Sequence, residues 1–203
     1  MIAIIDYGVG NLFSLCSSLK YIGADSIVTS DKDVIRSADK LILPGVGAFS
    51  DAKRKLSDSG LDILIKQEAE RGKDIMGICL GMQMLFERSY EYGEHTGLGL
   101  LRGEVVPMKG SIPENLKVPH IGWNALDFTR EHKLFKYIKN GDCVYFVHSY
   151  YASGCDDSLI ATAEYGKPLT AAVALDNIMG CQFHPEKSGK VGMDILRAFC
   201  EEV

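Results

Sequence analysis

The chain has 203 residues, of which 46% are hydrophobic and 24% are charged, and its formal net charge is −5 at pH 7. These values are ordinary for a folded globular protein and exclude disordered, collagen-like and coiled-coil chains. The acidic balance, with no dense stripe of basic residues, argues against a nucleic-acid-binding protein. The apolar runs, such as Leu41–Leu43, are too short to span a bilayer. The length favours a single domain over residues 1–203.

The N-terminus and the cysteines indicate where the protein works. The first residues lack the basic segment of a secretory signal and reach a carboxylate at Asp6, so we expect a cytoplasmic protein. No two of the six cysteines have a C-x-x-C spacing, which favours reduced thiols over disulfides. No cluster of histidine, cysteine and carboxylate residues has the spacing of metal ligands, so we expect neither a metal nor another cofactor.

The first half of the chain predicts strands that alternate with helices. Short apolar runs predict strands over residues 2–5, 26–29, 40–43 and 74–78. Apolar residues at helical spacing predict helices over residues 12–22, 49–69 in two segments, and 80–88. Strands separated by helices are typical of βαβ units. We therefore expect an α/β fold with a mostly parallel central sheet and flanking helices.

The second half predicts a different organisation. Strand-like runs occupy residues 105–106, 143–147, 159–163, 170–175 and 178–183. Asp176 and Asn177 form a plausible two-residue hairpin turn between the last two runs. An amphipathic helix, with apolar residues from Val191 to Phe199, closes the chain. The C-terminal half should therefore add an antiparallel β section to the parallel core.

A five-residue pattern, Gly77-Ile78-Cys79-Leu80-Gly81, lies where the fourth predicted strand meets the next helix. This is the layout of a nucleophile elbow, in which a sharp turn lifts the nucleophile out of the sheet. The flanking glycines let neighbouring backbone segments approach the turn, and a helix N-terminus favours the thiolate. We interpret Cys79 as a nucleophile, with a buried structural cysteine as the alternative.

Only one of the five histidines is followed two residues later by a carboxylate. In His184-Pro185-Glu186 the side chains of His184 and Glu186 face the same side of an extended segment. Glu186 can therefore orient the imidazole and stabilise its charged form. We interpret Cys79, His184 and Glu186 as a catalytic triad, with a solvated loop pair as the alternative for the last two.

The predicted strand at 40–43 runs into a glycine-rich corner, Pro44-Gly45-Val46-Gly47-Ala48. Glycines at such a corner can turn backbone N–H groups toward a ligand. One donor placed on a tetrahedral oxyanion contributes on the order of 3 kcal/mol. The backbone N–H of Leu80, which follows the nucleophile, can supply another. An ordinary tight turn is the alternative for the corner.

These elements together resemble the class I glutamine amidotransferases, and among them the glutaminase subunits of imidazole glycerol phosphate synthase. The resemblance covers the whole chain and rests on DYGVGNL at 6–12, PGVGAF at 44–49, GICLGMQ at 77–83, GLGL at 97–100, VPHIGWN at 118–124 and HPEKS at 184–188. One departure is Phe13, where many members carry arginine. The family implies a flavodoxin-like sheet and a single amidotransferase domain.

The resemblance also implies roles for individual residues. Cys79 attacks the side-chain amide of glutamine, while His184, oriented by Glu186, transfers protons. The oxyanion is held by the backbone at Val46, Gly47 and Leu80. The residues implied to contact glutamine are Gly47, Gln83, Ser149 and Tyr150, and those implied to face a partner are Asn11, Trp123 and Asn124.

The family implies a separate partner, the (β/α)8 cyclase subunit of imidazole glycerol phosphate synthase, in a heterodimer. Ammonia passes to it without entering bulk water and is used to make imidazole glycerol phosphate and aminoimidazole carboxamide ribonucleotide in histidine biosynthesis. Glutaminase activity should be low in the isolated chain, with the oxyanion corner ordered only when the partner carries its ligand.

Three other functions stay open from the sequence. A paralogous glutaminase would supply ammonia to a different synthase, for example in surface-sugar synthesis. A flavodoxin-like cysteine hydrolase would act on peptides, although the glycine corner and Gln83 favour a small amide. A non-catalytic binding module would retain only a vestigial site, which the intact Cys79, His184 and Glu186 argue against.

Overall fold

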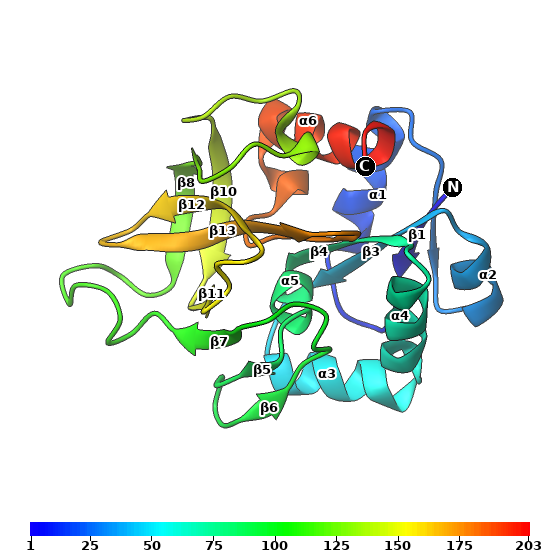
Figure 1. The fold of residues 1–203 in the computed structure, drawn as a ribbon, viewed down its shortest axis with the longest axis horizontal. Coiled ribbons are helices and arrows are strands. Elements are labelled where there is room, and N and C mark those ends of the chain that lie inside the picture. The colour runs from blue at the N-terminus through cyan, green and yellow to red at the C-terminus, as the bar shows by residue number, and fades with distance from the viewer.

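The structure is a computed structural model that describes residues 1–203. Its helices are α1 (Leu12–Tyr21), α2 (Lys32–Ser37), α3 (Phe49–Asp58), α4 (Leu61–Glu70), α5 (Leu80–Met84) and α6 (Gly189–Glu201), with 3-10 turns η1 (Lys133–Phe135) and η2 (Pro185–Lys187). Its strands are β1 (Ile2–Ile5), β2 (Ser26–Thr29), β3 (Lys40–Gly45), β4 (Asp74–Cys79), β5 (Arg88–Ser89), β6 (His95–Thr96), β7 (Glu104–Pro107), β8 (His120–Ala125), β9 (Asp127–Phe128), β10 (Cys143–His148), β11 (Tyr150–Ser153), β12 (Leu159–Glu164), β13 (Pro168–Leu175) and β14 (Ile178–Cys181). Figure 1 shows these elements around one large sheet.

The large sheet has eight strands in the order β2-β1-β3-β4-β14-β13-β12-β9. The strands from β2 to β14 in this order run parallel to one another, whereas β13, β12 and β9 join by antiparallel pairing. The predicted α/β fold, with a mostly parallel sheet and an antiparallel C-terminal section, is confirmed. The predicted hairpin turn at Asp176 and Asn177 links β13 to β14, where Leu175 lies opposite Ile178.

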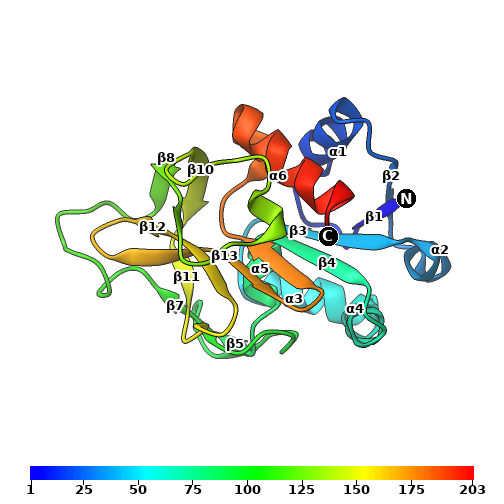
Figure 2. The same cartoon turned by 45° about the horizontal axis from the view of Figure 1, so that its top comes forward.

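Helices cover both faces of the parallel part of the sheet. α1 and α6 contact each other on one face, and α3, α4 and α5 cover the other face (Figures 1 and 2). Successive side chains of a strand point to opposite faces, so Ile4 packs in the cluster with α1 and α6, and Ile5 packs in the cluster with α3 to α5. Burial on both faces explains the apolar runs of the inner strands β1, β3, β4 and β14, whereas the edge strand β2 is only partly buried. Each helix is too short or too polar to cross a bilayer.

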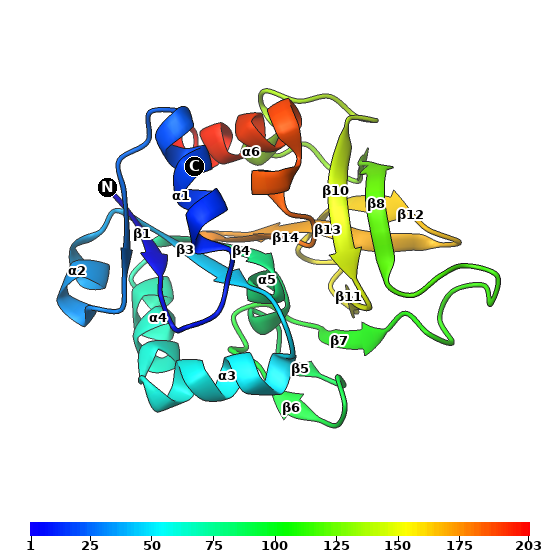
Figure 3. The same cartoon turned by 180° about the vertical axis from the view of Figure 1, so that it is seen from behind.

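Two smaller sheets adjoin the antiparallel end of the large one. β8 and β10 form an antiparallel ribbon, seen from behind in Figure 3, in which His120 lies opposite His148. The second small sheet has the order β11-β7-β5-β6. Only Ser149 separates β10 from β11, so the segment from His148 to Tyr150 crosses directly from one small sheet to the other.

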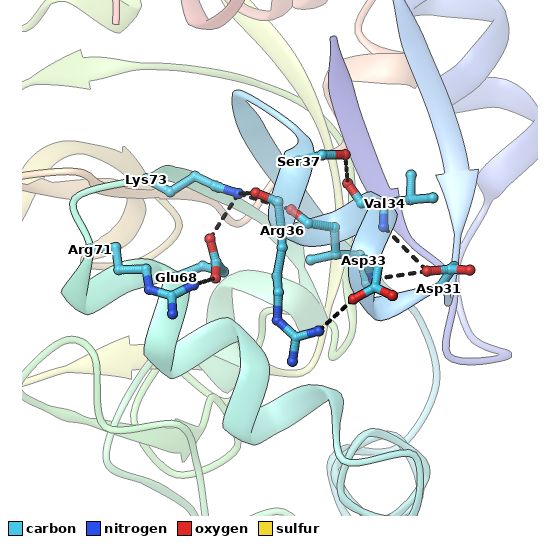
Figure 4. Close-up of polar contacts among 9 residues, drawn as sticks. Asp31, Asp33, Val34, Arg36, Ser37, Glu68, Arg71 and Lys73 are labelled. Atoms are coloured by element: carbon cyan, nitrogen blue, oxygen red, sulfur yellow. Dashed lines mark hydrogen bonds and ion pairs between the residues drawn. The ribbon is translucent and has the colours of Figure 1, made fainter.

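Helix α2, which the apolar pattern does not predict, is held at both ends by side chains (Figure 4). The Asp31 carboxylate accepts two backbone N–H groups at its start. At its end Lys73 donates to two backbone carbonyls. Lys73 also lies 2.8 Å from the carboxylate of Glu68 on α4, which in turn pairs with Arg71 at 2.6 Å. These contacts fasten a six-residue helix that is too short to be stable on its own.

The helix predicted over residues 80–88 is shorter than expected and ends at Met84. The Met84 carbonyl accepts a hydrogen bond from the backbone N–H of Leu98, and the Leu85 carbonyl accepts one from Leu100. These carbonyls therefore bond to a distant segment and do not continue the helix. Leu85 and Phe86, which follow Met84, are apolar because they are buried in the core. Their apolar character extended the predicted helix beyond its true end.

Several strand predictions also differ from the structure. The strand predicted over 178–183 ends at Cys181, because the chain turns away from the sheet and the backbone N–H of His184 donates to the carbonyl of Tyr145 on β10. Strands β5, β6, β8, β9 and β11 were not predicted, and β8 is the longest of them. It contains Gly122, only His120 in it is buried, and it has no continuous apolar run, so only its pairing with β10 reveals it.

Candidate active site

Cys79 lies at the end of β4, where the chain turns sharply into α5. Its backbone has φ 54° and ψ −111°, a conformation that is strained for any residue except glycine. A Cβ on Gly81 would lie 1.8 Å from the Leu43 carbonyl oxygen, and one on Gly77 would lie 2.7 Å from Cα of Met82. Both positions therefore require glycine, and the turn has the geometry of a nucleophile elbow.

The side chain of His184 interacts with Cys79 on one side and is hydrogen-bonded to Glu186 on the other. The Nδ1 atom of His184 lies 2.8 Å from Oε1 of Glu186, and both side chains are 3% exposed. Burial by itself would lower the pKa of His184, but its hydrogen bonds to Cys79 and Glu186 and their negative charges raise this pKa to about 9. The imidazole therefore favours its protonated form and can serve as a proton donor beside the Cys79 sulfur.

The second carboxylate oxygen of Glu186 has a distinct environment. Oε2 is buried and has no hydrogen-bond partner. A cavity of about 10 Å³ beside it is lined by Glu186, His184 and Asn11, among others. Asn11, which the family resemblance assigns to a partner-facing side, thus lies close behind the triad, at the start of α1.

Two glutamines link the triad to the neighbouring strands. The amide nitrogen of Gln182 donates to Sγ of Cys79 at 3.7 Å, and its amide oxygen accepts from the amide nitrogen of Gln83 at 2.9 Å. Gln83 also donates to the Tyr150 carbonyl at 3.1 Å. Gln182 was not predicted as a site residue from the sequence. Its position two residues before His184, on the same side of an extended segment, is the signal that identifies it.

A cavity of about 280 Å³ opens beside Cys79. Its walls include every residue for which the family resemblance implies a contact with glutamine or with the oxyanion. Its lining is Val46, Gly47, Cys79, Leu80, Gln83, Glu91, Pro119, Val147, His148, Ser149 and Tyr150. The tertiary structure therefore brings together four chain segments that are far apart in sequence. No group of three potential metal-ligating side chains is present.

The glycine-rich corner after β3 lines this cavity with Val46 and Gly47, and it contains backbone N–H groups that have no hydrogen-bond partner. Neither the N–H of Val46 nor that of Gly47 makes a hydrogen bond within the chain. Gly47 has φ +90°, a left-handed conformation that favours glycine. The corner is held at its start by the buried hydroxyl of Tyr7, which donates to the Pro44 carbonyl at 2.6 Å.

Glu91 is the only charged side chain among the cavity residues, and the sequence analysis did not identify it. It lies in the loop between β5 and β6, and its Oε2 accepts the backbone N–H of Phe49 at 2.6 Å. Burial raises the pKa of Glu91, and the hydrogen bond from Phe49 opposes this shift. No local pattern marks this residue, since only the packing of the loop against α3 brings it to the cavity.

Two of the residues that the family resemblance assigns to the partner-facing side, Trp123 and Asn124, point to opposite faces of β8. Trp123 is 58% exposed and lies on the same face of β8 as Ile121, which is 59% exposed. Asn124 points to the opposite face, where its amide donates to the Glu164 carbonyl at 2.8 Å. Phe13, the departure from the family pattern, is 84% exposed on α1.

Comparison with known proteins gives a consistent result. The family model described as glutamine amidotransferase class-I matches residues 3–203. A protein of Caldanaerobacter subterraneus subsp. tengcongensis, named imidazole glycerol phosphate synthase subunit HisH, is 50% identical and covers 100% of this chain and 98% of its own length. Proteins of the same name from Lactococcus lactis subsp. lactis and Aquifex aeolicus are 49% and 48% identical, covering 100% and 97% of this chain and 98% and 94% of their own lengths.

Solved structures show that the fold is shared more widely. A crystal structure of a glutamine amidotransferase superposes with a TM-score of 0.77 at 18% identity, covering 99% of this chain and 98% of that one. A structure of PurLQS from Thermotoga maritima has a TM-score of 0.72 at 21% identity, covering 98% and 96%. On the match of the whole chain and the identity to relatives that share its length, this chain belongs to the class-I glutamine amidotransferase family.

Proposed function

We propose that this chain is the glutaminase subunit of an imidazole glycerol phosphate synthase, with Cys79, His184 and Glu186 as its catalytic triad. The observation that carries the proposal is the position of the Cys79 thiol. It lies on a strained elbow in the wall of a small cavity, beside a histidine that a carboxylate orients. The match over residues 3–203 and the relatives named HisH support this function for the whole chain as one domain.

The cavity suits a free amino acid. Its volume of about 280 Å³ lies just below the range of about 300–1,000 Å³ that is typical of small-ligand sites, and this size disfavours a polypeptide substrate. Glutamine carries an ammonium group at one end, and the carboxylate of Glu91 is the charge complement that the cavity offers. The amide of Gln83 and the backbone of Ser149 and Tyr150 line the rest of the site.

The first half of the reaction forms a thioester. The Cys79 thiolate attacks the side-chain amide carbon, and the resulting oxyanion is held by backbone N–H groups of Val46, Gly47 and Leu80. Protonated His184 gives its proton to the amide nitrogen, the carbon–nitrogen bond breaks, and ammonia leaves. Glu186 keeps the imidazole oriented and stabilises its positive charge.

The second half regenerates the enzyme. Neutral His184 accepts a proton from a water molecule, whose oxygen attacks the thioester carbon. The carbon–sulfur bond breaks, glutamate leaves, and the thiolate and protonated imidazole are restored. The same backbone donors serve both tetrahedral intermediates, so one cavity performs both steps.

The ammonia is used by a partner, which we propose is a (β/α)8 cyclase subunit that makes imidazole glycerol phosphate in histidine biosynthesis. The word subunit in the names of the relatives supports an assembly. Ile121 and Trp123 on the exposed face of β8 are suitable anchors, since large apolar and aromatic side chains carry most interface energy. Six free thiols suit a reducing cytoplasm.

Glutamate release from glutamine tests this function in three states: the chain alone, the chain with a cyclase barrel, and the chain with the barrel and its ribonucleotide ligand. We expect the third state to be strongly stimulated and Cys79→Ala to abolish the activity. Cys143→Ala, which removes an exposed thiol on β10, is the matched control and should stay active.

Other outcomes would point elsewhere. Activity that neither the barrel nor its ligand changes would retain the glutaminase and remove the histidine pathway, although relatives at about half identity do not favour a different synthase. No activity in any state, with Cys79 unreactive toward a chloroketone analogue of glutamine, would leave a binding module.

A further inference from the structure

Two buried histidines outside the triad, one of them in the cavity wall, have no part in the reaction described above. His120 on β8 and His148 on β10 are cross-strand partners, with Nδ1 of His120 3.0 Å from Nε2 of His148. His120 is stacked between the rings of Phe146 and Tyr165, with centroid distances of 4.9 and 4.1 Å. Both imidazoles are held rigidly, and His148 forms part of the cavity wall.

The hydrogen bonds assign every proton of this pair. Nδ1 of His148 lies 2.9 Å from the Tyr150 carbonyl, which can only accept, so Nδ1 carries the hydrogen. Burial lowers the pKa of His148 to about 4, so its Nε2 is unprotonated and accepts from Nδ1 of His120. Burial also lowers the pKa of His120.

The second ring nitrogen of His120 agrees with this assignment. Since Nδ1 of His120 carries the hydrogen, its Nε2 is unprotonated and can accept a hydrogen bond, and it lies 3.4 Å from the amide nitrogen of Asn124. The amide oxygen of Asn124 accepts the backbone N–H of Ala125 at 2.9 Å, which fixes the amide orientation and leaves the nitrogen as donor. The hydrogen bonds therefore run in one direction, from Asn124 through His120 and His148 to the Tyr150 carbonyl.

The Tyr150 carbonyl connects this series to the nucleophile. It accepts hydrogen bonds from both His148 and Gln83. The same amide nitrogen of Gln83 donates to Gln182, whose own amide nitrogen donates to Sγ of Cys79. A shift of the carbonyl would therefore move the cavity wall at Tyr150 and the amides that lie between this wall and the sulfur.

We propose that His120 and His148 are positioning residues for the glutaminase reaction. As a neutral pair, each protonated on Nδ1, they hold the Tyr150 carbonyl and through it the amides of Gln83 and Gln182 beside the Cys79 sulfur. Neither histidine transfers a proton to the substrate. This inference rests on the proposed function, since the reaction that it serves is the hydrolysis of glutamine.

The tautomers can be measured without any activity. In two-bond proton–nitrogen correlation spectra of the histidine-labelled wild-type chain at pH 7, we expect both His120 and His148 to be protonated on Nδ1 and unprotonated on Nε2. Single substitutions assign the signals. An Nε2-protonated His148, or a doubly protonated ring in either residue, would overturn the inference whether or not the chain is a glutaminase.

Kinetics test the positioning effect. His148→Phe keeps a ring but removes both hydrogen bonds, and we expect kcat/KM for glutamine, measured with the loaded partner, to fall at least tenfold, since small displacements of catalytic groups have large effects on rate. His148→Asn places an amide nitrogen where Nδ1 was and keeps the donor to Tyr150. It should recover most of the loss, and a merely structural role would not predict this rescue.

The control is His132→Phe, which removes a half-buried histidine near Asp74, at the opposite end of β4 from Cys79; its kcat/KM should equal that of the wild type. A folded His148→Phe variant with wild-type kcat/KM would sink the inference, as would an Asn variant no better than Phe. If the His148→Phe variant does not fold, the tautomer spectra of the wild-type chain still test the inference, because tautomers other than those expected would contradict it. A wild-type complex that releases no glutamate would instead remove the proposed function.

Discussion

The amide nitrogen of Gln182 lies 3.7 Å from the sulfur of Cys79, directly after the end of β14, the strand next to the one that carries the nucleophile. An N–H donor at this place stabilises a thiolate more than a thiol, because it hydrogen-bonds to the charged form. The contact exists because β14 pairs with β4 in parallel, with Cys181 opposite Ile78, so the residues that follow these two lie side by side.

We predict that Gln182→Met slows the alkylation of Cys79 by a chloroketone analogue of glutamine about tenfold, the effect of losing one hydrogen bond to a charged group. The methionine fills a similar volume but donates no hydrogen bond. Gln67→Met, on an exposed turn of α4, is the control. Equal alkylation rates in all three proteins would show that the donor has no effect on the thiolate.

A second prediction concerns the pH dependence of activity. The pKa of His184 is about 9 although burial would lower it, because Cys79 and Glu186 raise it. The active ion pair is lost when the imidazolium deprotonates, so kcat/KM should fall as pH rises through about 9. Glu186→Gln removes one of the two charges and should move this fall to lower pH. If kcat/KM fell at the same alkaline pH in both proteins, Glu186 would not be the group that raises the pKa of His184.

The same shift affects stability. The pKa of His184 is higher in the folded chain than its ordinary value of 6.5. Its contribution to the free energy of unfolding is therefore fully present below pH 6.5 and is lost as pH rises toward 9. In Glu186→Gln this alkaline loss should be smaller, and urea unfolding at pH 6 and pH 9.5 measures it.

His148 should act on stability in the opposite direction. Burial lowers its pKa to about 4, the Tyr150 carbonyl partly opposes this shift, and nearby His120 and His184 add to it. Its contribution to the free energy of unfolding is present above pH 6.5 and is lost as pH falls toward 4, and about 2 kcal/mol of it has been lost at pH 5. The loss of unfolding free energy between pH 7 and pH 5 should therefore be smaller in His148→Asn than in the wild type. Identical losses in the two proteins would rule out a buried neutral His148.

The elbow glycines allow a prediction about packing. Gly81→Ala would place a methyl group 1.8 Å from the Leu43 carbonyl oxygen, so α5 must move away from β3. We expect destabilisation at the upper end of the about 1–3 kcal/mol seen for overpacked cores, together with loss of Cys79 alkylation. Gly23→Ala, where φ is +78° and no atom lies within 4 Å, should reduce stability by only about 1 kcal/mol and retain alkylation. Full reactivity of a folded Gly81→Ala protein would contradict the close approach.

The ion pairs around Glu68 provide a stability prediction far from the site (Figure 4). Burial would raise the pKa of Glu68, but Lys73 and Arg71 lower it. The contribution of the Glu68 carboxylate to the free energy of unfolding is therefore lost as pH falls. Glu68→Gln leaves Lys73 partly buried without its charge partner, and we expect a loss of about 3 kcal/mol in urea unfolding at pH 7. Asp51→Asn breaks an exposed pair with Arg54 and should change stability by less than about 0.5 kcal/mol. Equal effects of the two substitutions would refute the buried pair.

Features that depend on neighbours in the chain were predictable. The parallel strands were identified because each is a continuous apolar run, and β1 and β2 match their predicted limits. The elbow was identified because its glycines and its cysteine lie within five residues. Strand β8 was missed because its exposed face carries Ile121 and Trp123 while its other face carries His120 and Asn124, which is neither an apolar run nor a clean alternation.

The sequence by itself determined the fold class, the elbow and the His184–Glu186 pair, because chain spacing places these atoms within a few ångströms of each other. Only the tertiary structure decided which other side chains surround the nucleophile. Gln83 and Gln182 are 99 residues apart, Phe49 and Glu91 are 42 apart, and His120 and His148 are 28 apart. Each pair meets only through sheet pairing or loop packing, and hydrogen bonds across such separations leave no periodic pattern in the chain.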